Sequence, residues 1–208
     1  ARNIHAFRWT AGYSWVKQRT VYVPAQITSA AYARVRDLNE PLIRETISTG
    51  LATAVTEQEA VLGGALEIIE RDAFMIQWFN QLSCPRAVPA DLVARHPTLS
   101  LALERCTHYG LSVDFVRMAT DAPAHALCAI VTDASDMPPR TIGLAAHKNP
   151  GRAAEKALFE ALRARRNARR RLAKLTEPFT KPIHEIRHME RSLYWFDRTH
   201  AKGLTFLT

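Results

Sequence analysis

The sequence has no continuous run of about eighteen apolar residues, the length that a membrane-spanning helix requires. Its first residues, ARNIHAFRW, lack the apolar stretch of a secretory signal. Only three cysteines occur, and none belongs to a C-x-x-C pair, which disfavours a disulfide framework and a cysteine zinc site. We therefore expect reduced thiols in the core of a cytoplasmic protein that has no membrane partner.

Both common glycine-rich phosphate loops are also missing, since neither G-x-x-x-x-G-K nor G-x-G-x-x-G occurs. A nucleotide site in this chain would have to be built from other groups.

Positive charge, in contrast, is abundant and concentrated in one segment. The formal net charge is +8, and residues 161–181 alone hold eight basic residues against the single acid Glu177, a local excess of +7. Such a segment attracts phosphate, an acidic peptide or nucleic acid, or it is a solvated helix face or a contact with a partner subunit. The arginine run RARRNARRR inside this segment has no base-stacking aromatic residue, which disfavours nucleic acid.

Apolar periodicity divides the chain into strands and helices that do not alternate strictly. Strand patterns occupy 21–23, 111–118, 126–133 and 141–147, and we also expect a strand at 193–196. Helical spacing predicts helices over 56–82, 98–108 and 151–174. This mixture favours an α+β fold in which a mixed or antiparallel sheet packs against long helices.

The strongest helix signal begins at Thr56, which forms a capping box with Glu59. Inside this helix Glu67 and Glu70 share one face, and Arg71 follows Glu67 by four residues. Glu67 also lies on a stripe of small and apolar residues, where an unpaired charge would be costly. The simplest interpretation is a Glu67–Arg71 ion pair, and the alternative is a carboxylate site that takes a cation.

A later helix, in AAEKALFEALRARR, carries Glu160 on a face of small residues. If the two helices pack together, Glu67, Glu70 and Glu160 converge. Clustered carboxylates favour Mg²⁺, which completes its shell with water and phosphate oxygens, and neighbouring basic side chains would hold the phosphates. The residues therefore permit a magnesium–nucleotide site without a glycine-rich loop.

Five motifs in order resemble one protein family. STGLATAVTEQEAVLGGALEIIERDAF resembles the central signature of the YcaO family, S-x-G-x-A-x-G followed by a capped helix that ends in E-x-x-E-R-D. The preceding WTAGYSW and VYVPAQ resemble W-x-x-G-x-S and V-x-V-P-A. The following IGLAAH and EKALFEALRAR resemble G-x-A-A and E-x-x-Q-x-R. The resemblance extends from about Trp9 to Arg165, most of the chain.

The resemblance implies an ATP- and Mg²⁺-dependent enzyme that activates a peptide backbone amide. In peptide natural-product pathways such proteins are cyclodehydratases, which turn Cys, Ser or Thr of a ribosomal precursor peptide into azolines, the precursors of thiazoles and oxazoles; relatives make thioamides or amidines. The expected partners are that precursor peptide, a leader-peptide-binding protein and a second copy of the chain. By resemblance, the metal ligands are Glu67, Glu70 and Glu160, and the rest of the nucleotide site comprises Ser48, Gly50, Arg71, Arg163 and Arg165.

The chain departs from the family pattern at two positions and in length. Arg163 stands where the family prefers Gln or Glu, and this cation would repel magnesium or bind a phosphate directly. Ala54 replaces the second glycine of the signature. The family's N-terminal nucleotide-contacting segment and proline-rich end have no match, so we expect residues 1–208 to be one YcaO-like domain truncated at both ends. The alternative function is a scaffold or substrate-binding subunit without catalysis.

The stretch HEIRH at 184–188 matches the zinc-peptidase pattern H-E-x-x-H, in which two imidazoles one helical turn apart bind zinc. A third ligand would have to come from Glu190, Asp197 or His200, and Arg187 places a cation between the two histidines. The surrounding sequence also lacks a deep apolar helix. We therefore expect an exposed polar helix rather than a zinc metallopeptidase.

Overall fold

The computed structural model describes residues 7–29, 32, 40–44, 47–87, 93, 95–135, 138–175, 179, 181–186, 190–196, 200 and 202–207. The chain divides into two compact units, residues 1–51 and residues 52–208. None of the helices in the described ranges combines the length and the apolar character that crossing a bilayer requires.

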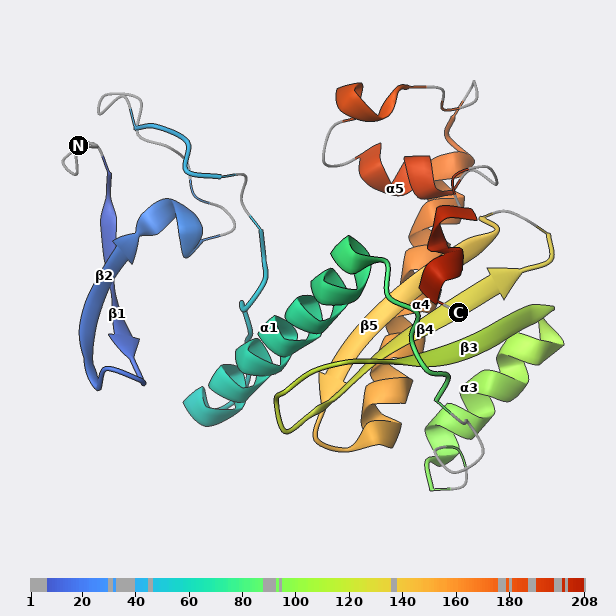
Figure 1. The fold of residues 1–208 in the computed structure, drawn as a ribbon, viewed down its shortest axis with the longest axis horizontal. Coiled ribbons are helices and arrows are strands. Elements are labelled where there is room, and N and C mark those ends of the chain that lie inside the picture. The colour runs from blue at the N-terminus through green and yellow to red at the C-terminus, as the bar shows by residue number, and fades with distance from the viewer. Residues whose placement is uncertain are drawn as a thin grey trace. The chain divides into compact units, whose positions relative to one another are not determined.

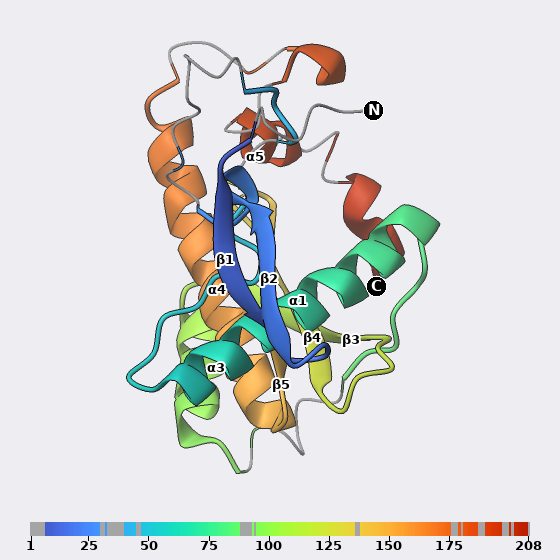
Figure 2. The ribbon, with the colours of Figure 1, turned by 90° about the vertical axis from the view of Figure 1, so that its left-hand side faces the viewer.

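The N-terminal unit is built on an antiparallel hairpin of β1 (Trp9–Ser14) and β2 (Arg19–Pro24), seen in Figure 2. A short 3-10 helix, η2 (Ala25–Ile27), follows β2 and contains the buried side chain of Gln26. The Gln26 amide donates to Glu40 Oε1 at 3.2 Å and to the carbonyl of Pro41 at 3.0 Å, and its oxygen accepts from the N–H of Ile43 at 3.0 Å. This one buried amide therefore fastens residues 40–43 to the hairpin.

The second unit is a three-stranded antiparallel sheet with helices on both faces (Figure 1). Its strands are β3 (Leu111–Met118), β4 (His125–Asp133) and β5 (Arg140–His147), in the order β3-β4-β5, so β4 is central. This arrangement confirms the predicted α+β class and the three predicted strands.

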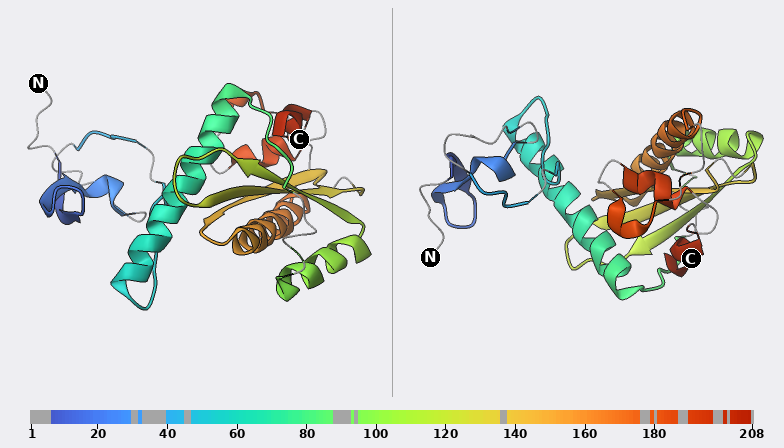
Figure 3. Two further views of the ribbon diagram at one scale, coloured as in Figure 1. Left: turned by 60° about the horizontal axis from the view of Figure 1, so that its bottom comes forward. Right: turned by 90° about the horizontal axis from the view of Figure 1, so that it is seen from above.

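The sheet separates two apolar cores. The nearly edge-on view in Figure 3 (left) shows helices on its two faces. Helices α3 (Pro97–His108) and α4 (Pro150–Leu172) cover one face, where the buried alanines of α4 pack with Leu127, Ala129 and Val131. Helix α1 (Glu57–Asn80) and the 3-10 helix η6 (Lys202–Leu207) cover the other, against Cys128 and Ile130. The alternation of side chains along β4 explains why one apolar strand serves both cores.

The ends of the long helices agree with their capping residues. Thr56 accepts from the N–H of Glu59, and the Glu59 carboxylate accepts from the N–H of Thr56, each at 3.3 Å, which is the predicted capping box. Asn149 caps α4 by accepting from the N–H of Arg152 at 3.0 Å, and Pro150 occupies the first turn. All three cysteines are free and buried, as predicted, and burial raises the pKa of each thiol.

The strand expected at 193–196 is wrong. Residues Arg191–Trp195 form a short helix, α5, whose Trp195 ring meets Trp78 of α1 edge-on with centroids 5.2 Å apart. Four consecutive apolar residues are compatible with both the 3.6-residue repeat of a helix and the two-residue repeat of a strand. Here the packing against α1 favours the helix.

Candidate functional site

Three carboxylates from two helices surround one guanidinium group in the second unit. Arg71 Nε lies 3.2 Å from Oε1 of Glu70, and Arg71 Nη2 lies 3.9 Å from Oε1 of Glu67, all on α1. The same Nη2 lies 3.9 Å from Oε1 of Glu160, which belongs to α4. The ion pair expected between Glu67 and Arg71 is therefore one part of a larger cluster.

The two helices meet because both reach the free edge of β5 from opposite faces of the sheet. The backbone N–H of Leu144, on this edge, donates to Glu160 Oε2 with an N···O distance of 3.4 Å. Gly143 lets α4 lie directly on the strand, because a Cβ at this position would stand 2.2 Å from the carbonyl oxygen of Ala157 and from the nitrogen of Ala161. This close approach places Glu160 beside α1.

The carboxylates line a hollow of about 350 Å³. We call it the carboxylate hollow, and its charged lining consists of Glu67, Glu70, Lys156, Glu160 and Arg163. Lys156 is not among the site residues predicted from the sequence. The signal was present, since Lys156 precedes Glu160 by four residues and Arg163 by seven, which is the spacing of one helix face. The hollow thus offers oxygen ligands from both α1 and α4, and cations from α4.

Glu70 is the most buried of the three acids, with its side chain 11% exposed. Burial raises the pKa of Glu70 to about 7; the positive charge of Arg71 opposes this shift, and Glu160 and Glu67 reinforce it. Glu70 Oε1 and Arg71 Nε are both buried without a hydrogen-bond partner, because their approach lacks hydrogen-bond geometry. The site therefore contains an acid that is costly to keep charged in the absence of a further cation.

Carboxylate oxygens are the ligands that Mg²⁺ prefers, so the chemistry of these three acids suits a magnesium ion. Within the described ranges, however, no three His, Cys, Asp or Glu side chains stand close enough together to hold a metal ion. In this arrangement it is the Arg71 guanidinium that contacts all three carboxylates.

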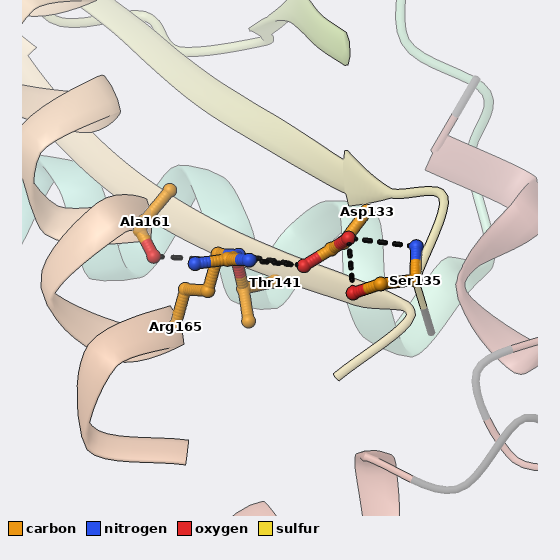
Figure 4. A network of polar contacts seen from close by, with 5 residues as sticks. All are labelled: Asp133, Ser135, Thr141, Ala161 and Arg165. Atoms are coloured by element: carbon orange, nitrogen blue, oxygen red, sulfur yellow. Dashed lines mark hydrogen bonds and ion pairs between the residues drawn. The ribbon is translucent and has the colours of Figure 1, made fainter. Parts of the chain in front are cut away.

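Arg165, another predicted site residue, does not line the carboxylate hollow. Its Nε donates to Asp133 Oδ2 at 3.0 Å and its Nη2 contacts the same oxygen, while Ser135 donates to Oδ1 through its N–H at 2.8 Å and its hydroxyl at 2.6 Å (Figure 4). Burial alone would raise the pKa of Asp133, but the hydrogen bonds from Ser135 and Arg165 outweigh it and lower the pKa. We call this the Asp133–Arg165 pair.

Ser48 and Gly50 lie in the N-terminal unit, whereas the other predicted residues lie in the second. The Ser48 carbonyl accepts from the N–H of Leu51 at 2.9 Å, and Gly50 adopts a φ of 84°. This left-handed conformation explains the choice of glycine in the turn.

Three of the five residues of the HEIRH pattern, 184–186, are described. His184 and Glu185 are exposed, and their side chains lie 3.6 Å apart in the 3-10 helix η4 (Ile183–Glu185). Arg187 and His188 lie outside the described residues. Among those that are described, His184 joins no cluster that could hold a metal ion.

Comparison with known sequences now decides the family. The sequence model of "YcaO cyclodehydratase, ATP- and Mg²⁺-binding" matches residues 3–208. The chain belongs to the YcaO family. A relative of this YcaO chain, an uncharacterised protein encoded in the tfuA 3′ region of Rhizobium leguminosarum bv. trifolii, is 28% identical over 171 residues, which cover 77% of this chain and 39% of that protein.

Solved structures support the YcaO fold. The Escherichia coli microcin synthetase McbBCD complex with pro-MccB17 bound matches with a TM-score of 0.73 and 13% identity over 97% of this chain and 50% of the other. YcaO from Methanopyrus kandleri, bound with AMPPCP and Mg²⁺, matches with a TM-score of 0.65 and 20% identity over 88% and 46%. At these identities the likeness shows the fold alone, and the chain spans half or less of each relative.

Proposed function

We propose that this YcaO-family chain binds ATP and Mg²⁺ in the carboxylate hollow and activates a backbone amide of a ribosomal precursor peptide. The expected product is an azoline formed from Cys, Ser or Thr, with ATP converted to ADP and phosphate while the peptide loses the elements of one water. The supporting observation is that acids of α1 and α4 line a single hollow together with Lys156 and Arg163. A leader-peptide-binding protein and a second copy of the chain remain proposed partners.

Each residue of the hollow has a role that follows from its charge. Bound magnesium would neutralise phosphate charge, the main requirement of phosphoryl transfer. Glu67, Glu70 and Glu160 supply oxygen ligands, and Lys156 and Arg163 hold phosphate oxygens. Arg71 contacts all three acids in this structure and would compete with a divalent cation for their oxygens, and its guanidinium could also bind a phosphate.

Calorimetry with ATP and Mg²⁺ tests this proposal. The wild-type chain is expected to release heat, and Glu70→Gln is expected to lose binding because it removes a charged ligand. Glu104→Gln, which changes an exposed acid on α3, is the matched control and keeps binding. Absence of heat with the wild type, or equal affinity in both variants, would contradict the site.

A scaffold or substrate-binding subunit without catalysis is the second candidate. The observation in its favour is Arg71, whose guanidinium contacts all three acids and competes with a metal ion. Mass spectrometry of a Cys-rich test peptide with ATP and Mg²⁺ separates the candidates. Loss of one water from the peptide supports the enzyme, and peptide binding without ATP binding supports the scaffold.

A further inference from the structure

A row of cations continues from the carboxylate hollow along the outer face of α4 and the turn after it. Arg163, Arg166, Arg170 and Lys174 follow one another at spacings of three, four and four residues, which places them on one stripe of the helix. All four residues are exposed, and none has an ion-pair partner among the described residues. We call these four residues the basic track; Arg163, its first member, also lines the hollow.

The track is held outward by the packing of the opposite side of α4. Ala157, Ala161 and Ala168 are buried on that side, so the helix cannot rotate to hide its cations. Of the other arginines nearby, Arg165 pairs with Asp133 and Arg171 donates to Ser192 Oγ at 2.9 Å, whereas Arg169 is exposed beside the stripe. The track is therefore a distinct set of available charges within a longer basic segment.

Favourable interaction with the helix dipole explains only part of the track. Cations stabilise a helix in its last turn, which accounts for Arg170. Arg163 and Arg166 lie earlier, where like charges three or four residues apart repel one another and weaken the helix. An anionic partner that lies along the stripe would remove this repulsion.

The dimensions of the track suit an extended chain. From Arg163 to Lys174 the helix advances about 16 Å at about 1.5 Å per residue. An extended peptide covers this distance in about five residues, and its alternate side chains point to the same side. Acidic residues at every second position would therefore meet successive cations of the track.

We propose that the basic track binds an acidic stretch of the peptide substrate in extended form and so directs the adjoining residues of that peptide into the carboxylate hollow. The inference rests on the proposed function, because it takes a peptide as the molecule that must reach the hollow. The inference adds the position of the peptide on the protein surface and the acidic character of its side chains.

A peptide fits the surroundings of the track better than a nucleic acid does. Residues 163–174 contain no aromatic side chain on which a base could stack. Glu160 adjoins the first cation and repels a charged backbone. A peptide can end its acidic stretch before the hollow, whereas a nucleic acid carries a negative charge at every nucleotide.

Fluorescence anisotropy with a labelled peptide that has glutamate at every second position tests the proposal on the whole chain. A peptide with glutamine at those positions is the ligand control. The triple variant Arg166→Gln, Arg170→Gln, Lys174→Gln is expected to bind the acidic peptide about tenfold more weakly, since each exposed contact contributes a few-fold. Calorimetry with ATP and Mg²⁺ is expected to be unchanged, because none of these three side chains lines the hollow.

A second triple variant with the same change in net charge removes exposed cations from other surfaces: Arg105→Gln, Arg117→Gln, Lys148→Gln. This variant is expected to bind the acidic peptide as the wild type does. Equal losses in both triple variants would overturn the inference, and so would tighter, track-dependent binding of single-stranded oligouridylate. If the wild type binds the peptide through the basic track but binds no ATP, the proposed catalysis is contradicted and the peptide-binding inference is supported. If the wild type binds ATP and the track variant keeps full peptide affinity, only the peptide-binding inference is contradicted.

Discussion

The carboxylate hollow and the Asp133–Arg165 pair are both built from acids and arginines beside β5, yet they differ in how well the charges are satisfied. Asp133 is 5% exposed and accepts hydrogen bonds from Ser135 and Arg165, and its pKa is lowered. Glu70 is 11% exposed, its Oε1 has no hydrogen-bond partner, and burial raises its pKa to about 7. Two acids of similar exposure, one on α1 and one at the end of β4, therefore have pKa values shifted in opposite directions.

The difference separates a well-satisfied ion pair, Asp133–Arg165, from a cluster whose buried acid has no hydrogen-bond partner for its Oε1. A buried acid with several donors is already satisfied and gains nothing from a further cation. An acid that is buried beside other acids, with one poorly aligned arginine, gains from a divalent ion. Perturbed acids of the second kind mark candidate sites, and that is the reason for placing function in the hollow.

The largest expected effect is on the satisfied pair. Arg165→Ala leaves the Asp133 charge buried without its main cation, which we expect to lower the free energy of unfolding by about 3 kcal/mol. Urea denaturation measures the loss, and Arg166→Ala, which truncates the exposed neighbour, is the control with little change. A small loss in Arg165→Ala would show that the pair is not structural and would remove the contrast.

The contact beneath both sites gives the next effect. Gly143→Ala places a methyl group against the backbone of α4, which we expect to cost about 2 kcal/mol of stability and to weaken ATP binding by shifting Glu160. Gly12→Ala in β1, where a Cβ has nothing within 4 Å, is the matched glycine control. An unchanged melting temperature for Gly143→Ala would show that α4 does not need this close approach.

The third expected effect is a pH dependence of stability that has opposite sign in the two regions. The folded pKa of Glu70 is raised to about 7 from 4.5, so its contribution to stability falls as pH rises between these values. The folded pKa of Asp133 is lowered from 3.8, so its contribution is present above that value and lost as pH falls through the folded pKa. Urea denaturation from acidic to neutral pH, with Glu70→Gln and Asp133→Asn, measures each part.

Glu70→Gln should remove the fall in stability as pH rises from about 4.5 to 7, and Asp133→Asn should remove the loss of stability at low pH. If Glu70→Gln leaves the fall in unfolding free energy between about pH 4.5 and pH 7 unchanged, the pKa of Glu70 is not raised in the folded protein. The electrostatic difference between the two regions would then not exist.

Local patterns predicted most of the described secondary structure. The apolar alternation of β3 and the capping box of α1 are short-range properties, so both elements were found with nearly correct ends. The strand predicted for 193–196 was wrong because four apolar residues are compatible with the repeat of a strand or of a helix, and contact with Trp78 favoured the helix. The single-domain expectation for 1–208 stays a prediction.

The site was only partly predictable. Helical spacing and the family resemblance singled out Glu67, Glu70 and Glu160, and the same spacing would have found Lys156. Arg165 was expected at the nucleotide, but it is turned toward Asp133, which is more than thirty residues away in sequence. No local pattern reports which of two neighbouring arginines will find a distant acid.

By itself the sequence determined most of the helices and strands, the family that the chain resembles and the helix faces that carry acids and cations, because these depend on spacing within a few turns. Only the tertiary structure decided that Arg71 contacts all three acids and that Gly143 lets α4 approach β5. It also decided that Arg165 pairs with Asp133 and does not line the carboxylate hollow. These outcomes depend on distances between atoms of separate elements, which packing fixes and which no single stretch of sequence contains.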